Sequence, residues 1–198
     1  TSATLSFKLS PNDKNIMTPT GKYTYEKAFP QIFMNFEKGF NTLGGDLDYH
    51  RLDALIIHQF RSKLGFTNIK LFGGISSGTA PIWKNFEIAG HRDTSPDKWY
   101  QNINTPSNIG FTTMPSGTFF ADKFVGFKIS QYLPFRFKTI GSRYSNLEVE
   151  YQSAIGDFKN RGDHQFDFQV LDHYYQEVGI IWNRFLGRNF GVGFSYRL

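Results

Sequence analysis

Apolar and polar residues alternate along most of this 198-residue chain. Successive side chains of a β-strand point to opposite faces, so a period of two predicts strands with one apolar and one polar face. Clusters of Gly, Pro, Asn and Asp separate the alternating stretches, as expected for turns. The pattern predicts eight strands, over residues 1–9, 29–40, 51–64, 66–76, 118–133, 146–157, 174–184 and 188–198.

The apolar face carries aromatic residues at both ends of at least one expected strand. Tyr174 and Trp182 are eight residues apart, which is about 26 Å along a strand and about 20 Å in height at a tilt near 40°. That height is close to the ~25 Å apolar band that aromatic girdles flank in membrane barrels. Several stretches also match the roughly 9 to 11 residues of a tilted membrane strand better than the shorter soluble average.

These features predict an all-β fold, an antiparallel transmembrane β-barrel that spans residues 1–198. A soluble barrel or sandwich alternates in the same way, with its aromatic residues in the core, and it is the competing interpretation. In the membrane interpretation, the residues expected to face lipid are Tyr174, Trp182, Phe190, Val192, Phe194 and Tyr196.

The polar face of the expected strands carries charged residues, which remain hydrated and paired when they face a lumen. The lumen-facing polar residues are therefore expected to be Lys128, Glu148, Glu150 and Glu177. If the strands on either side of residues 134–145 pair antiparallel, Lys128 lies close to the glutamates of the next strand. We predict that Lys128 is within salt-bridge reach of Glu148 or Glu150.

The composition argues against two other classes of protein, helical membrane proteins and proteins that bind nucleic acid. With 22 Phe, 10 Tyr and 3 Trp the chain is 18% aromatic, yet its mean hydropathy is only -0.40, and it holds no apolar run of the ~20 residues that a membrane helix needs. The net charge of +5 comes from scattered Lys and Arg, which argues against nucleic acid as a partner. The lack of Cys slightly favours an exported protein.

The lengths of the connections suggest how the strands are oriented. The turns at residues 64–66 and 186–187 are tight, whereas residues 77–117 and 158–173 form long connections. Outer-membrane barrels have short periplasmic turns and longer extracellular loops. That orientation places the end of the last strand outside the cell and implies at least one further strand, so that these eight belong to a larger closed sheet. The opposite orientation closes eight strands and puts the long connection in the periplasm; the first is favoured.

The start of the chain shows no signal peptide, which we expect to have been removed or to lie upstream in a longer protein.

The long loop at 77–117 contains Trp83, Arg92 and Trp99. A loop of this length without secondary structure is usually functional or disordered. Its aromatic residues favour an ordered loop that folds over the pore or enters it.

Several short motifs resemble sites of chemistry but lack the context that the chemistry needs. Residues 74–78 match G-x-S-x-G, yet no helical pattern follows to support an oxyanion hole. The histidines have no spacing that defines a metal site, and turn chemistry explains an Arg-Gly-Asp tripeptide. We therefore expect no catalytic residue, no metal and no cofactor. The residues concerned are Ser76, His91 with Asp93, His164 with Asp163 and Asp167, Asp172 with His173, and Arg161 with Gly162.

Several short segments carry a resemblance that spans most of the chain: residues 18–21, 29–30 with the strand to 39, 72–74, 175–180 and 194–198. Together they resemble a Bacteroidota outer-membrane family in which a carboxypeptidase-regulatory-like domain precedes a BamA-like, surface-antigen-type barrel. The resemblance implies that this chain is the C-terminal barrel portion. In that superfamily an Arg-Gly-Phe motif of a long loop docks inside the barrel; here Arg92, after Ala89, Gly90 and His91, is only a loose analogue.

The resemblance implies a non-enzymatic protein of the bacterial outer membrane, acting in biogenesis or translocation or as an accessory subunit of a membrane complex. Its expected partners are outer-membrane lipid, lipopolysaccharide and other outer-membrane or periplasmic proteins. A passive or substrate-selective channel is the alternative, and a soluble ligand-binding β-barrel is the third candidate.

Overall fold

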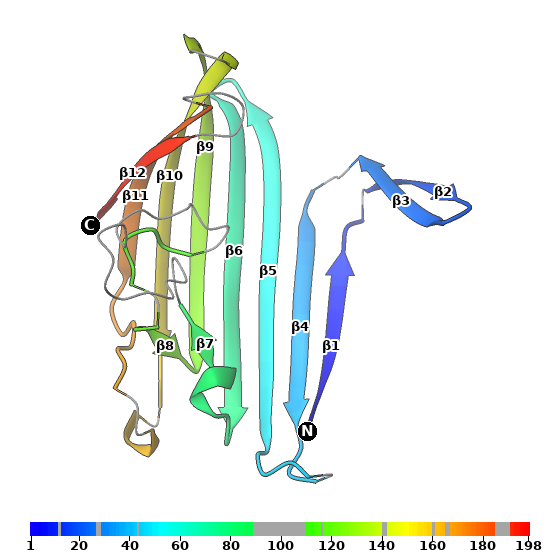
Figure 1. The fold of residues 1–198 in the computed structure, drawn as a ribbon, viewed down its shortest axis with the longest axis vertical. Coiled ribbons are helices and arrows are strands. Elements are labelled where there is room, and N and C mark those ends of the chain that lie inside the picture. Colours follow the sequence, from blue (N-terminus) through cyan, green and yellow to red (C-terminus); the bar gives the residue numbers. More distant parts are fainter. Residues whose placement is uncertain are drawn as a thin grey trace.

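One large antiparallel β-sheet dominates the computed structural model, which describes residues 1–11, 13–26, 29–42, 44–88, 110–115, 117–139, 142–159, 161–164, 167–184 and 191–198. The sheet has eight strands in the order β1-β4-β5-β6-β9-β10-β11-β12. Each strand therefore lies beside its sequence neighbour among the eight, and Figure 1 shows them as a tall, curved wall. The expected all-β architecture is confirmed.

All eight predicted strands are present in the sheet. The period-two pattern located them correctly because every strand separates an apolar from a polar face. Their bounds are β1 Ser2–Leu9, β4 Gln31–Gly39, β5 Tyr49–Ser62, β6 Gly65–Gly78, β9 Lys123–Thr139, β10 Ser142–Asp157, β11 Tyr175–Asn183 and β12 Val192–Arg197.

The sequence pattern missed two small two-stranded sheets. One is the hairpin of β2 (Lys14–Thr18) and β3 (Gly21–Glu26), in the connection that joins β1 to β4, and it projects sideways from the wall in Figure 1. Strands β7 (Phe86–Glu87) and β8 (Phe120–Ala121) pair within the long connection. The helical segments of the described residues are short 3-10 turns, η1 (Ile82–Lys84) and η3 (Arg161–Asp163).

Residues 134–139 were expected to lie in a connection, and they instead continue β9. Pro134 follows the expected end of this strand directly, and a proline cannot donate a hydrogen bond to a ladder. In the structure the β9–β10 register shifts between Asn146 and Glu148, and β6 reaches β9 only as far as Tyr132. Pro134 therefore lies at an irregularity beyond the reach of β6, where its missing N–H leaves no ladder bond unmade.

The tight turn expected at residues 64–66 joins β5 to β6. Gly65 has a φ of 110°, a backbone conformation that residues other than glycine rarely adopt. A Cβ at this position would also lie 2.0 Å from the Tyr132 carbonyl oxygen. The turn at 186–187 lies outside the described residues. The long connections, between β6 and β9 and between β10 and β11, leave the wall at its opposite end (Figure 1).

The sheet places its apolar side chains on the outside. Large apolar residues stay exposed along the outer face of the sheet. On the opposite, inner face many polar side chains are buried. The exposed set on the eight strands includes Leu5, Phe7, Leu9, Met34, Phe36, Leu52, Ile56, Phe60, Leu71, Ile75, Val125, Ile180, Phe194 and Tyr196.

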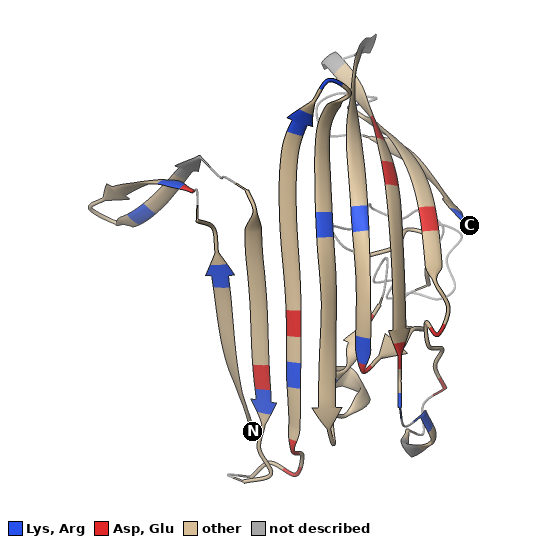
Figure 2. Cartoon of the chain, turned by 180° about the vertical axis from the view of Figure 1, so that it is seen from behind, with Lys and Arg blue, Asp and Glu red and all other residues tan. Residues whose placement is uncertain are grey.

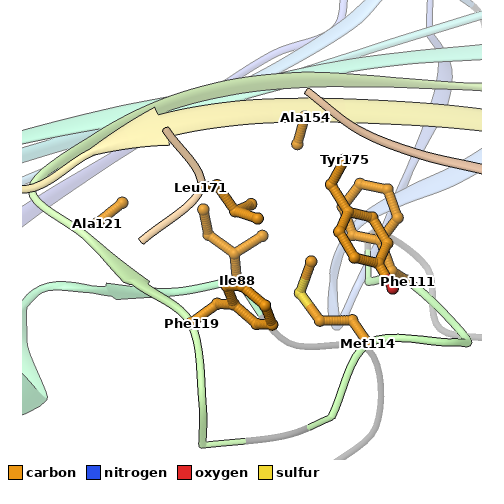
Figure 3. Packing of buried hydrophobic residues seen from close by; sticks show 8 residues of the cluster. All are labelled: Ile88, Phe111, Met114, Phe119, Ala121, Ala154, Leu171 and Tyr175. Atoms are coloured by element: carbon orange, nitrogen blue, oxygen red, sulfur yellow. The ribbon is translucent and has the colours of Figure 1, made fainter. Parts of the chain in front are cut away.

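The well-packed apolar core lies on the inner side of the wall, under the long connection. Figure 3 shows its side chains converging from β10, from β11 and from segments that cross in front of the sheet. Hydrophobic burial here fixes the connection against the sheet. The cluster consists of Ile88, Phe111, Met114, Phe119, Ala121, Ala154, Leu171 and Tyr175, with Phe124 packed against it.

The two edge strands of the wall are β1 and β12. Within the part of the chain that the structure describes, neither has a partner on its outer side, so the sheet is open rather than closed. No helix among these residues is long and apolar enough to cross a membrane.

Candidate functional site

The inner face of the sheet has two parts, a hollow near the tight-turn end and a covered region near the long connections. The hollow has a volume of about 660 Å³. It is lined mainly by amide, hydroxyl and charged side chains from β4, β5, β6, β9, β10 and β11. The lining residues are Phe29, Gln31, Ile57, Gln59, Asn68, Lys70, Lys128, Ser130, Tyr132, Glu148, Glu150, Ile181 and Asn183.

An ion pair between neighbouring strands lies at the centre of the hollow. Lys128 Nζ is 2.9 Å from Glu150 Oε1, and Ser130 donates a hydrogen bond of 3.0 Å to the same oxygen. Both charged side chains are almost fully buried, where a pair is held more firmly than at a surface. The predicted contact between Lys128 and a β10 glutamate is confirmed.

Glu148 extends the charged lining toward the tight-turn end. It accepts a hydrogen bond of 2.9 Å from Asn183 Nδ2 of β11. On the other side, Lys70 of β6 lies directly opposite Lys128 in the register of the two strands. Lysines thus gather on β6 and β9 and glutamates on β10 and β11, and in Figure 2 blue and red positions lie on adjacent strands of the wall.

Glu177 holds the far end of the long connection against the sheet. Its Oε2 accepts hydrogen bonds from the Thr113 backbone N–H (2.8 Å) and hydroxyl (2.6 Å). Its Oε1 accepts bonds from the Thr112 N–H and from Gln152 Nε2, both at 3.0 Å. A buried carboxylate with four donors is an anchor, because each bond to a charged group contributes more than a neutral one.

Aromatic side chains of the long connection fill the space beside this anchor. Phe111 is fully buried and packs edge-on to Tyr175 of β11, with ring centroids 4.9 Å apart. Small inward residues leave room for such rings: a Cβ on Gly74 would lie 2.4 Å from the Phe86 ring, and one on Gly126 would lie 2.7 Å from the Phe72 ring. We call residues 110–121, with 86–88, the plug.

The start of the long connection is fixed to the other half of the wall. Lys84 of η1 lies 2.6 Å from Glu37 Oε1 of β4, and the hydroxyl of Tyr49 donates to the same oxygen. Arg51 of β5 donates to the Lys84 carbonyl oxygen at 3.2 Å, and its guanidinium lies over the Phe86 ring. The long connection therefore contacts the inner face of the sheet at both of its described ends.

The structure brings the four predicted lumen residues to one face. Lys128, Glu148 and Glu150 line the hollow, whereas Glu177 anchors the plug. The sequence did not predict the anchoring role, because the donors come from a backbone segment whose position only the fold defines.

The residues expected to face lipid lie on the opposite side, as far as the structure describes them. Trp182 faces outward, opposite Leu147 and Val192, and Phe194 and Tyr196 are exposed. Tyr174 is exposed and immediately precedes β11. Phe190 lies outside the described residues.

Of the loop candidates, Trp83 belongs to η1 and is exposed rather than packed into the lumen. Its neighbour Lys84 makes the contact to the wall instead. Arg92 and Trp99 lie outside the described residues, so their predicted roles remain predictions.

The candidate catalytic motif has the geometry of a strand. Ser76 belongs to β6, is buried, and donates its hydroxyl to Asn85 Oδ1. A nucleophile elbow needs a sharp turn into a helix directly after the serine, and here β6 continues to Gly78.

The described histidines also lack the features of a metal site. No group of three or more His, Cys, Asp or Glu in the described segments is arranged to hold a metal ion. His173 Nδ1 lies 2.8 Å from Asp172 Oδ1, and this hydrogen bond lowers the pKa of the exposed Asp172 carboxyl below its usual value. Arg161 of η3 lies 3.6 Å from the same carboxylate, so the cluster is a surface contact between loops. His91 and Asp93 lie outside the described residues.

Comparison with known proteins gives a family match for the first part of the chain. Residues 1–75 match the C-terminal domain of a family of unknown function (DUF5686). The matched segment runs from β1 into β6 and so includes half of the strands of the wall. No curated protein and no solved structure matches the chain.

Proposed function

We propose that this chain forms part of the wall of a bacterial outer-membrane β-barrel. The observation that carries the proposal is the distribution of side chains across the sheet: apolar groups are exposed outside, while an ion pair, amides and hydroxyls are buried inside. A soluble sheet of this size needs its apolar face covered, because soluble monomers rarely expose contiguous apolar patches larger than a few hundred Å². Lipid is the environment that satisfies such a face.

The open edges support a larger barrel. Strands β1 and β12 offer unpaired N–H and C=O groups on their outer sides within the described chain, and such groups are too costly to leave in a hydrocarbon environment. In our proposal these edges pair with further strands, and the eight strands are one section of a closed wall.

Within that barrel we propose a role in biogenesis or translocation at the outer membrane, or as an accessory subunit of a membrane complex. Support comes from the plug, since a lumen crossed by the protein's own chain does not suit free diffusion. The sequence resemblance to BamA-like barrels points the same way. The proposed partners are outer-membrane lipid, lipopolysaccharide and other outer-membrane or periplasmic proteins.

A channel is the second candidate, and one observation favours it. The hollow is polar and charged, as expected for a surface that solutes pass. Single-channel recording of the full-length protein in planar bilayers separates the two. We expect small or absent conductance from a plugged assembly factor, whereas steady conductance of the unaltered protein identifies a channel.

The membrane proposal itself can be tested with single cysteines, because these 198 residues contain none and any cysteine elsewhere in the full-length protein can be replaced by serine first. Val125 and Ile180 are exposed on the outer face, and Gln59 lines the hollow. In outer-membrane vesicles of the full-length protein, we expect a charged maleimide to label Gln59→Cys but to leave Val125→Cys and Ile180→Cys unmodified until the protein is unfolded in urea.

Tyr23→Cys is the positive control, because Tyr23 is exposed on the β2–β3 hairpin, away from the wall. Rapid labelling of both outer-face cysteines by the charged reagent, at the rate of Tyr23→Cys, would show that the outer face meets water and would refute the proposal.

A further inference from the structure

The hollow contains polar atoms that the protein itself does not satisfy. Gln31 Nε2 and Asn68 Oδ1 are buried and have no hydrogen-bond partner among the described residues. Both side chains line the hollow, and both are more than nine-tenths buried, with exposed fractions of 6% and 9%. A buried donor or acceptor without a partner is costly, so these two atoms indicate a place for an outside group that can both accept and donate.

The charges of the hollow argue against an ionic occupant. Its two lysines are balanced by two glutamates. Lys128 is already paired with Glu150, and Glu148 is held by Asn183. An anion would meet the glutamates and a cation would meet the lysines, because the lysines on β6 and β9 lie beside the glutamates on β10. The unsatisfied groups are neutral amides, and they favour a neutral ligand.

Flat and apolar side chains border the same space. Phe29 and Tyr132 line the hollow together with Ile57 and Ile181. Such side chains pack against the C–H groups of a ligand while the amides orient its polar groups. The volume of about 660 Å³ lies within the ~300–1,000 Å³ common for small-molecule sites.

We infer that the hollow binds a neutral polyhydroxylated ligand, a sugar of about disaccharide size. Each hydroxyl is at once a donor and an acceptor, so the hydroxyls of such a ligand can satisfy both Gln31 and Asn68 while a C–H face of a sugar ring lies on an aromatic side chain. The inference concerns the same lumen as the proposed function and rests on it for access from water. It adds the chemical class of the occupant.

The test uses the full-length protein, purified in detergent, and isothermal titration calorimetry with four probes. Maltose and lactose represent neutral sugars, glycylglycine a zwitterion of smaller size, and inorganic phosphate an anion. We expect at least one disaccharide to bind and expect no heat of binding from glycylglycine or phosphate.

Two variants remove the unsatisfied groups, and one serves as a matched control. Asn68→Leu and Gln31→Leu should each weaken disaccharide binding about tenfold, the loss expected when a buried hydrogen bond to a ligand is removed. Asn68→Asp keeps an acceptor at the same place and should retain more binding than Asn68→Leu. Asn15→Leu alters an amide on the β2–β3 hairpin, outside the hollow, and should leave the binding unchanged.

Folding is checked for every variant by the mobility shift of the unheated protein on gels and by far-ultraviolet circular dichroism. The inference is overturned if neither disaccharide binds the folded protein, if Asn68→Leu and Gln31→Leu leave the affinity intact, or if glycylglycine or phosphate is the only probe that binds. The cysteine labelling described above distinguishes a failure of this inference from a failure of the proposed function. A protein that protects its outer face but binds no sugar refutes this inference alone.

Discussion

The covered and the open halves of the inner face use the same strands in opposite ways. Under the plug the inward residues of β9 and β10 are small or aromatic, and the plug packs on them to form an apolar core. Toward the tight turns the inward residues are charged or amides, and a hollow remains. Glu177 and Gln152 lie between the two, where charge serves to hold the chain rather than to line open space. The identity of the inward residues therefore decides which part of the inner face is covered.

The largest expected effect is the removal of the most buried ring of the plug. Phe111→Ala leaves a cavity beside Tyr175, and loss of a buried Phe typically costs about 3–5 kcal/mol. We expect the backbone amides of residues 110–114 to exchange with deuterium at least about 100-fold faster, while amides of β9 around Lys128 exchange as before. Phe7→Ala, on the exposed outer face, is the control. Equal acceleration of amide exchange across the whole wall would contradict the division of the inner face into a covered half and an open half.

Loss of the Glu177 carboxylate should release the plug in a different way. Glu177→Ala leaves the Thr112 and Thr113 N–H groups and the Gln152 amide without their acceptor, at a cost of about 3 kcal/mol. In planar bilayers we expect openings that the unaltered protein lacks. Glu177→Gln keeps one acceptor oxygen and should open less often. Identical traces for all three proteins would show that the plug does not depend on this anchor.

The third prediction concerns the hollow half alone. Lys128→Met leaves Glu150 buried without its cation, which we expect to lower the free energy of unfolding by about 2 kcal/mol, less than for a dry interior because the lumen is hydrated. The double variant Lys128→Met with Glu150→Leu should be more stable than the Lys128→Met protein. Urea unfolding of the detergent-solubilised protein measures both, and additive losses in the double variant would argue against a coupled pair.

The smallest expected effect tests how closely the side chains of the inner face are packed. Gly126→Ala places a Cβ 2.7 Å from the Phe72 ring and 2.9 Å from the Ala154 Cβ, so the ring must move at a cost of about 1 kcal/mol. Urea unfolding should show this loss, and Phe72→Leu in the same protein should restore part of it. Gly162→Ala, where an added Cβ meets nothing within 4 Å, is the control. An unchanged free energy of unfolding in the Gly126→Ala protein would mean that the inner face can accommodate an added methyl group there.

The sequence predicted the wall well, because a strand with two different faces leaves a strong period-two signal. It predicted an ion pair of Lys128 with Glu148 or Glu150 for the same reason, since parity and antiparallel pairing leave few arrangements, and the structure selects Glu150. The β2–β3 hairpin was missed because its apolar residues, such as Met17 and Tyr23, are exposed and form no buried face.

The plug was only partly predictable. The long connection showed that a loop exists, but its anchor on Glu177 depends on contacts between residues more than sixty positions apart. One signal was present in the sequence: the inward positions of β9 and β10 near the long connections are occupied by Gly126, Ala154 and Gly156, and a run of small residues on a lumen face leaves space for another segment.

The extension of β9 past Pro134 has a consequence for the height of the molecule. A strand of 17 residues measures about 56 Å and, tilted by about 40°, rises about 43 Å. The apolar layer of a membrane is only ~25–30 Å thick. The tip formed by β9 and β10 is therefore expected to stand clear of the bilayer on the side of the tight turns. Anything that approaches the hollow from that side would have to pass this ridge.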